Sequence, residues 1–127
     1  MKLLLDTRAY VWHALNDPRL PGAVRTEIDD PANDVAASIA SFWEIGIKTS
    51  IGKWPMPINV RGLQKLAEEQ SIDIVPISME AIHYMASMDW FNKDPFDRLI
   101  AATASIRGDI LVTIEESFGE WGIKRLW

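Results

Sequence analysis

Short apolar runs alternate with segments of helical periodicity along this chain, and that alternation restricts the fold more than any other feature of the sequence. The apolar runs predict strands at residues 2–6, 34–37, 72–75, 110–113 and 122–126. The periodic segments predict helices at residues 8–15, 22–29, 60–70, 78–88 and 95–107, with a further helix that begins at Ser38 and ends before Gly52. Strands that alternate with helices form parallel sheets, because each connection returns as a helix over one face. We therefore expect an α/β fold with a mainly parallel central sheet and helices on both faces.

The expected elements follow one another without the change in composition that would mark a second domain. The chain has 127 residues, 48% of them apolar, which is the size and content of one domain with one core. The apolar run at residues 1–5 is far too short for a secretion signal or a membrane span. We expect a single domain over residues 1–127, located in the cytoplasm and away from membranes.

Several carboxylates fall where the loops of a parallel sheet converge. Asp6 and Glu115 each follow an expected strand, Glu44 lies in the first turns of a helix, and Asp94 and Asp97 lie at the start of another. Ligands of open α/β sheets bind beyond the carboxyl ends of the strands. These acids, although far apart in sequence, are therefore expected to meet at one edge of the sheet.

Carboxylates gathered in this way repel one another and take up protons unless a cation is present. The chain has no cysteine and two histidines, so a thiolate or imidazole-rich site is excluded and any metal must be held by oxygen atoms. Mg²⁺ or Mn²⁺ matches such ligands. The chemistry these residues allow is a metal-activated water that attacks a phosphodiester.

The charge of the chain opposes simple electrostatic binding of nucleic acid. Its formal net charge is -5 and its isoelectric point about 4.9. A nucleic-acid enzyme is compatible with this charge only if the acids are concentrated around a cation while basic residues surround them. The residues expected to do so are Arg8, Lys48, Lys53, Lys93 and Arg98.

Helix capping offers an alternative reason for most of these acids. The run Asp94-Pro95-Phe96-Asp97 is typical of a helix start, with aspartate at the N-cap and proline at the first helical position. Residues 41–44 and 113–116 also have the spacing of a capping box, and Lys48 stands one turn after Glu44, where an ion pair is the usual outcome. Asp6 is the exception, because it closes an apolar strand, where an unpaired charge is costly.

The same residues resemble the PIN-domain family and, within it, the VapC-type toxins. The resemblance covers four segments: MKLLLDTRAYVW at residues 1–12, ASIASFWEIGIKTSIGK at 37–53, KDPFDRLIAATA at 93–104 and ILVTIEESF at 110–118. It implies a PIN-like three-layer α/β/α sandwich. It also implies that Asp6, Glu44 and Asp97 bind metal, that Glu115 takes the fourth acidic place, and that Asp94 is an accessory acid or a cap. Thr113 matches the hydroxyl that commonly precedes the fourth acid.

Two positions depart from the family pattern. Relatives more often have aspartate in the place of Glu115, and many have histidine in the place of Arg8. The change at Glu115 puts the geometry of a second metal ion in doubt. Arg8 adds positive charge where a phosphate would pass and removes a titratable group.

The resemblance further implies an Mg²⁺-dependent endoribonuclease that acts on structured RNA such as transfer or ribosomal RNA. It implies inhibition by a VapB-type antitoxin and assembly as a homodimer. The chain has 6 tryptophans, which is many for one small core. Trp12, Trp43, Trp54 and Trp90 either line a dimer contact or the antitoxin's groove, or belong mostly to the core.

Two other functions remain open at this point. One is a PIN-like scaffold that has lost activity through its changes at Arg8 and Glu115 and acts by binding proteins. The other is a phosphatase or phosphotransfer domain with Asp6 as nucleophile. Arg8 argues against the second, since the haloacid-dehalogenase pattern has an aspartate at that place.

Overall fold

A single parallel sheet lies at the centre of the protein. The computed structural model describes residues 1–127. Five strands, in the order β3-β2-β1-β4-β5, make up the sheet. They are β1 (Lys2–Leu5), β2 (Asp34–Ser38), β3 (Asp73–Val75), β4 (Ile110–Val112) and β5 (Arg125–Leu126). All four pairings are parallel, and β1 lies in the middle, with Leu4 opposite both Ala36 and Leu111.

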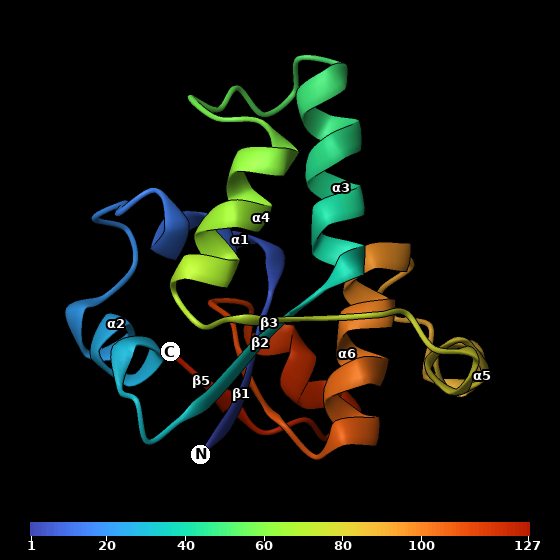
Figure 1. Ribbon diagram of the computed structural model, residues 1–127. Coiled ribbons are helices and arrows are strands. Elements are labelled where there is room, and N and C mark those ends of the chain that lie inside the picture. Colours follow the sequence, from blue (N-terminus) through green and yellow to red (C-terminus); the bar gives the residue numbers. More distant parts are fainter.

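Helices cover both faces of the sheet (Figure 1). They are α1 (Thr7–Ala14), α2 (Gly22–Asp29), α3 (Ile39–Ser50), α4 (Val60–Glu69), α5 (Met79–Ser87) and α6 (Pro95–Arg107), followed by a 3-10 segment, η1 (Glu116–Trp121). Leu3 and Leu5 pack with α1, α2 and α4 in one core cluster, whereas Leu4 packs with α5, α6 and η1 in the other. Neighbouring side chains of a strand point to opposite faces, so β1 divides its leucines between the two clusters. The result is the expected three-layer α/β/α arrangement.

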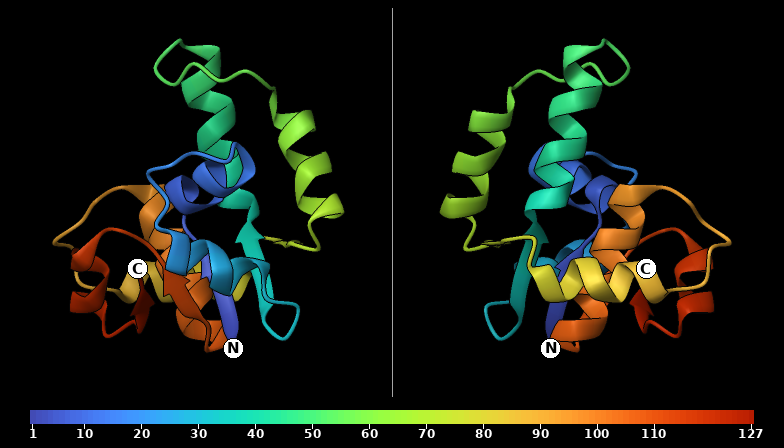
Figure 2. Two further views of the ribbon diagram at one scale, coloured as in Figure 1. Left: turned by 90° about the vertical axis from the view of Figure 1, so that its left-hand side faces the viewer. Right: turned by 90° about the vertical axis from the view of Figure 1, so that its right-hand side faces the viewer.

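Two helices extend past the carboxyl edge of the sheet. Figure 2 shows α3 continuing upward from β2 and α4 descending beside it. Ser38 caps the start of α3 through a hydrogen bond from the Ala40 N–H (3.0 Å), and Asn59 caps α4 through one from the Gly62 N–H (2.9 Å). The extended parts of α3 and α4 therefore stand along one side of the edge at which β1, β2 and β4 end.

The expected elements agree with the observed ones within about two residues, except at the carboxyl end of the chain. The expected strand at 122–126 is reduced to Arg125–Leu126, because Gly122 takes a left-handed conformation (φ +78°) that ends η1. The segment η1 itself was not expected. No helix has both the length and the apolar content needed to cross a lipid bilayer.

Candidate active site

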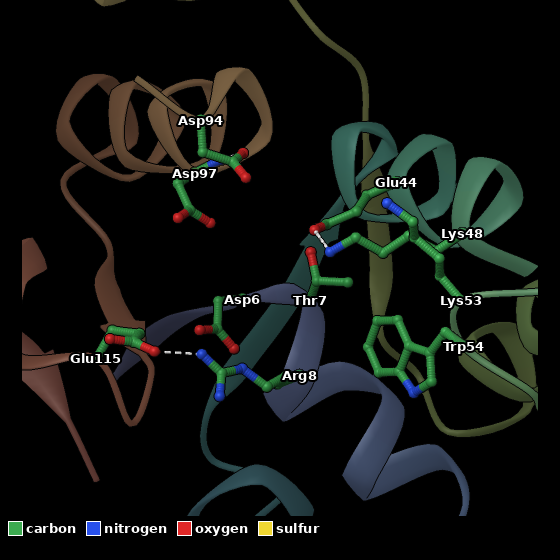
Figure 3. Close-up of a pocket in the computed structure, with 10 residues that line it drawn as sticks. All are labelled: Asp6, Thr7, Arg8, Glu44, Lys48, Lys53, Trp54, Asp94, Asp97 and Glu115. Atoms are coloured by element: carbon green, nitrogen blue, oxygen red, sulfur yellow. Dashed lines mark hydrogen bonds and ion pairs between the residues drawn. The ribbon is translucent and has the colours of Figure 1, made fainter. Parts of the chain in front are cut away.

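A pocket of about 520 Å³ opens at the carboxyl edge of the sheet. Ten residues line it, and all five expected acids are among them (Figure 3): Asp6, Thr7, Arg8, Glu44, Lys48, Lys53, Trp54, Asp94, Asp97 and Glu115. They come from the junction of β1 with α1, from α3 and the turn after it, from the start of α6 and from the loop after β4. The topology of the sheet thus brings together residues that are up to about a hundred positions apart.

Asp6 has the lowest exposed fraction of the pocket acids. Its side chain is buried, with Oδ1 accepting from the Ala9 N–H (2.8 Å) and Oδ2 accepting from the Thr113 hydroxyl (2.6 Å). Burial raises the pKa of this carboxyl, while the hydrogen bonds from Thr113 and Ala9 and the charge of Arg8 act in the opposite direction. Asp6 therefore caps α1 and also lines the pocket, so the two roles coexist at this residue.

Asp94 and Asp97 lie at the start of α6. Asp94 Oδ1 accepts from the N–H groups of Phe96 (2.8 Å) and Asp97 (3.0 Å), so the expected N-cap is present. Asp97 Oδ2 accepts from the Asn92 side-chain amide (3.1 Å). The pKa of Asp97 is raised to about 6, mainly by burial, and the charges of Asp94, Glu44 and Asp6 add to the rise. A charged Asp97 is thus held among like charges.

Glu44 and Glu115 differ from the aspartates because each faces a cation. Glu44 Oε2 is 2.5 Å from Lys48 Nζ, and the Glu44 side chain is buried. Arg8 forms an ion pair with Glu115, and both side chains are 45% exposed. The two positions that depart from the family pattern therefore contact each other.

Thr113 connects the end of β4 to the pocket. Its hydroxyl donates to Asp6 and accepts from the Glu115 N–H (3.0 Å). The expected capping box at residues 113–116 is wrong, because η1 begins after Glu115 without a side-chain cap. The one at 41–44 is also wrong, because Ser38 caps α3 and Ser41 instead accepts from the Thr7 hydroxyl (3.1 Å).

The expected ring of basic residues is only partly present. Arg8, Lys48 and Lys53 line the pocket, whereas Lys93 and Arg98 do not. The expectation for Arg98 was wrong because its side chain is 1% exposed and turns away into the fold. There it donates to backbone carbonyls and stacks on the Trp90 ring, with its central carbon 3.3 Å from the ring centroid. The carbonyls are those of Met85 (2.6 Å), Asp89 (2.8 Å), Met88 (2.9 Å) and Asn92 (2.9 Å).

Asn92 supports two of the pocket acids from outside the pocket, and sequence reasoning missed it. Its side chain accepts from the Asp94 N–H (2.8 Å) and donates to Asp97, while Arg98 holds its carbonyl. An asparagine two residues before an N-cap is a turn signal, and this was the only sign of its role. The chain of contacts from Arg98 through Asn92 fixes the position of the two aspartates.

The tryptophans do not share one role. Trp12 is buried in the core, which agrees with the core alternative. Trp43 and Trp90 are 50% and 55% exposed, so neither is a core residue. Trp54 is partly buried against the core cluster, which agrees in part with the core alternative, and it also lines the pocket, which was not expected.

The pocket has two unlike sides, which Figure 3 displays. The carboxylate wall consists of Asp6, Asp94, Asp97 and Glu115. The cationic wall consists of Lys48, Lys53 and Trp54, with Glu44 paired to it. This donor set, rich in carboxylates and without nitrogen or sulfur ligands, suits a hard cation. As the side chains lie, however, no three of the acidic or histidine residues are grouped closely enough to hold a metal ion.

The chain was compared with known proteins and structures. No curated protein matches the sequence. Among solved structures, VapBC2 from Rickettsia felis bound to a DNA fragment from their promoter is similar at 19% identity and a TM-score of 0.71, over 100% of this chain and 98% of that chain. VapBC-1 from nontypeable Haemophilus influenzae is similar at 18% identity and a TM-score of 0.70, over 99% and 97%. A toxin-antitoxin complex from Klebsiella pneumoniae is similar at 19% identity and a TM-score of 0.61, over 92% and 89%.

At sequence identities this low, the similarity to these structures establishes a shared fold and nothing more. The PIN domain family, in addition, matches residues 3–122, a range that includes every residue of the pocket. The match runs from the central strand to the end of η1. By this match and by its fold, the chain belongs to the PIN-domain family.

Proposed function

We propose that this chain is a metal-dependent endoribonuclease, the VapC-type toxin of a toxin-antitoxin pair. The observation that carries the proposal is one pocket in which five carboxylates from separate parts of the chain meet, two of them with raised pKa values. Acids that are costly to ionise side by side are stabilised as anions by a divalent cation. Membership of the PIN-domain family leaves the phosphatase alternative without support.

Asp6, Glu44, Asp97 and Glu115 are the proposed ligands of Mg²⁺ or Mn²⁺. The ion, when bound, supplies a water of lowered pKa as nucleophile and offsets the charge that develops on the phosphodiester. Asp6 is oriented for this role by Ala9 and Thr113, and Asp97 by Asn92. Asp94 acts as an accessory acid and as the cap of α6.

Arg8 and Lys48 have a second proposed role toward the substrate. Each now neutralises one glutamate of the pocket. A glutamate that turns to a divalent cation releases its basic partner, which can then bind a phosphate oxygen. The pocket would thereby present cations to RNA in spite of the net charge of the chain.

The proposal includes a partner and an assembly. The similar structures include a toxin-antitoxin complex, which supports a VapB-type antitoxin as partner. Exposed apolar side chains on α3 (Ile39, Trp43, Ile47) and on α5 (Met79, Ile82, Tyr84) support a protein contact such as a homodimer. We also propose that residues 1–127 act as one PIN domain in the cytoplasm, on transfer or ribosomal RNA.

The decisive experiment compares the wild type with Asp6→Asn and Asp97→Asn. Growth arrest on expression and cleavage of RNA are measured with Mg²⁺ and with EDTA. We expect both variants to fold and to lose at least about a hundredfold in cleavage rate, because each loses a proposed metal ligand. Asp73→Asn, an exposed acid on β3 outside the pocket, is the matched control and should behave as wild type. Full Mg²⁺-dependent cleavage by either pocket variant contradicts the ligand assignment.

A catalytically weakened scaffold is the second candidate, because the two departures from the family pattern, Arg8 and Glu115, are paired with each other. Calorimetric titration with Mg²⁺ or Mn²⁺ separates the two functions. A nuclease should bind the ion at millimolar concentration or below, and a scaffold should show no heat of binding.

A further inference from the structure

The cationic wall contains the single apolar side chain that lines the pocket, Trp54. The turn that carries it is folded back onto the end of α3, because the Lys53 and Trp54 N–H groups both donate to the Lys48 carbonyl (2.9 and 3.2 Å). Gly52 permits this turn with its left-handed conformation (φ +74°). Trp54 is partly buried, because it packs against one core cluster, and it also lines the pocket.

The ring of Trp54 differs from the other tryptophan rings in having neither an aromatic ring nor a closely placed cation as its neighbour. Trp12 pairs with Trp127, Trp43 with Phe96, Trp121 with Phe91 and Phe118, and Trp90 with the Arg98 guanidinium. The nearest cation to Trp54 is Lys48 Nζ, 5.9 Å from the ring centroid, at the outer limit of a cation–π contact. The ring is therefore available to a planar group that enters the pocket.

Lys53 is likewise uncommitted. Among the three basic residues of the pocket, Arg8 and Lys48 form ion pairs with Glu115 and Glu44, whereas Lys53 forms none. Its side chain is exposed and adjoins Trp54 in the chain. An unpaired ammonium beside a free aromatic face is the combination that binds a nucleotide by its phosphate and its base.

We propose that Trp54 and Lys53 form a subsite for an unpaired nucleotide next to the scissile phosphate. The base stacks on Trp54, and Lys53 contacts a phosphate of the same strand. The subsite rests on the proposed ribonuclease function and adds to it the two residues that select an unpaired nucleotide over a paired one. A base inside a duplex is stacked between its neighbours and cannot reach the ring. A pocket of about 520 Å³ has the size of an ordinary small-ligand site, so it accommodates a nucleotide.

The test measures binding of a short fluorescent single-stranded RNA and of the matching duplex by anisotropy, in EDTA so that no cleavage occurs. We expect the wild type to bind the single strand more tightly than the duplex. Trp54→Leu should raise the Kd for the single strand about tenfold, because stacking on an aromatic residue has roughly that effect per base. Trp54→Phe should retain most of the affinity. Lys53→Ala should lower the slope of log Kd against log salt concentration by about one.

The matched control is Trp127→Leu, which removes a partly exposed tryptophan outside the pocket and should leave the Kd unchanged. A second control leaves the protein unaltered and replaces single nucleotides of the RNA by abasic ones. Loss of the base at the subsite should weaken wild-type binding to the level of Trp54→Leu and should have no effect on that variant. This arm tests the subsite even if Trp54→Leu fails to fold.

Failure of this inference is distinguishable from failure of the proposed function. RNA binding that depends on Trp54, without any Asp6-dependent cleavage, leaves the subsite in place and removes the nuclease. Asp6-dependent cleavage with unchanged Kd and KM in Trp54→Leu overturns the subsite alone. Equal binding of single strand and duplex by the wild type, or no binding of either, also overturns it.

Discussion

The two walls of the pocket are built in different ways. On the carboxylate wall, Asp6, Asp94 and Asp97 are each fixed by hydrogen bonds to backbone or to a neighbouring side chain at a strand end or a helix start. On the cationic wall, Lys53 and Trp54 extend from a turn that is held by hydrogen bonds to the Lys48 carbonyl and by packing of Trp54 against the core cluster. Strand ends and helix starts are placed by the sheet itself, whereas a turn can change with little effect on the core. The comparison indicates that the sheet places the carboxylates of this pocket, whereas a loop places Lys53 and Trp54.

The largest effect should come from breaking the support of the carboxylate wall at Arg98. We expect Arg98→Leu to lower the free energy of unfolding by about 3 kcal/mol, because four backbone carbonyls lose a charged donor that is buried with them. Arg98→Lys should retain only part of the wild-type stability, since one ammonium cannot make the several hydrogen bonds of the guanidinium. Urea unfolding measures the change, and Arg61→Leu, at an exposed position of α4, is the control. If Arg98→Leu were as stable as the wild type, the carboxylate wall would not depend on the hydrogen bonds of Arg98.

An intermediate effect should appear in the pH dependence of stability. Asp97 has a pKa of about 6 in the folded protein against 3.8 for the free side chain, so the folded state binds its proton more tightly. In EDTA, the Asp97 contribution to the free energy of unfolding should therefore be fully present below about pH 4 and be lost as the pH rises through about 6. Asp97→Asn should remove this part of the pH dependence, and the control Asp73→Asn should retain it. Unfolding curves at several pH values check this, and a stability that rises over that interval contradicts it.

The smallest effect should distinguish the lysines of the cationic wall. Lys48→Met removes the partner of Glu44, so a divalent cation no longer has to compete with an ammonium group for that carboxylate. We expect the Kd for Mn²⁺ to fall by roughly twofold to fivefold, in line with the modest strength of a partly exposed ion pair. Lys53→Met is the matched control, because Lys53 has no carboxylate partner, and its Kd should stay near that of the wild type. Calorimetric titration gives both values, and equal shifts would mean that pairing with Glu44 does not matter.

Most of the fold was predictable because local signals and tertiary structure agree. Leu3, Leu4 and Leu5 form a continuous apolar run, which is what a central strand buried on both faces requires. Asp94, Pro95 and Gly108 mark the start and end of α6, and the helix has those bounds. The segment η1 was missed because six residues with Gly119 inside them have no helical periodicity to detect.

The acids of the pocket were predictable for a different reason from its other residues. Asp6 and Glu115 follow strands, and parallel strands end at one edge, so topology alone places them together. The role of Arg98 was not predictable. The sequence Asp97-Arg98 is the same whether the arginine faces solvent or is buried under Trp90, as it is here. Trp54 was also beyond prediction, since its place depends on how the turn after α3 folds back.

The central strand serves the core and the pocket with the same few residues. Leu3 and Leu5 supply one core cluster, Leu4 the other, and Asp6 follows at once as the first residue of the pocket. An insertion or deletion of one residue here would exchange the faces of the leucines and move the acid by about 3.3 Å along the strand. Length variation among homologous chains should accordingly spare this stretch and accumulate in segments such as the turn between α2 and β2.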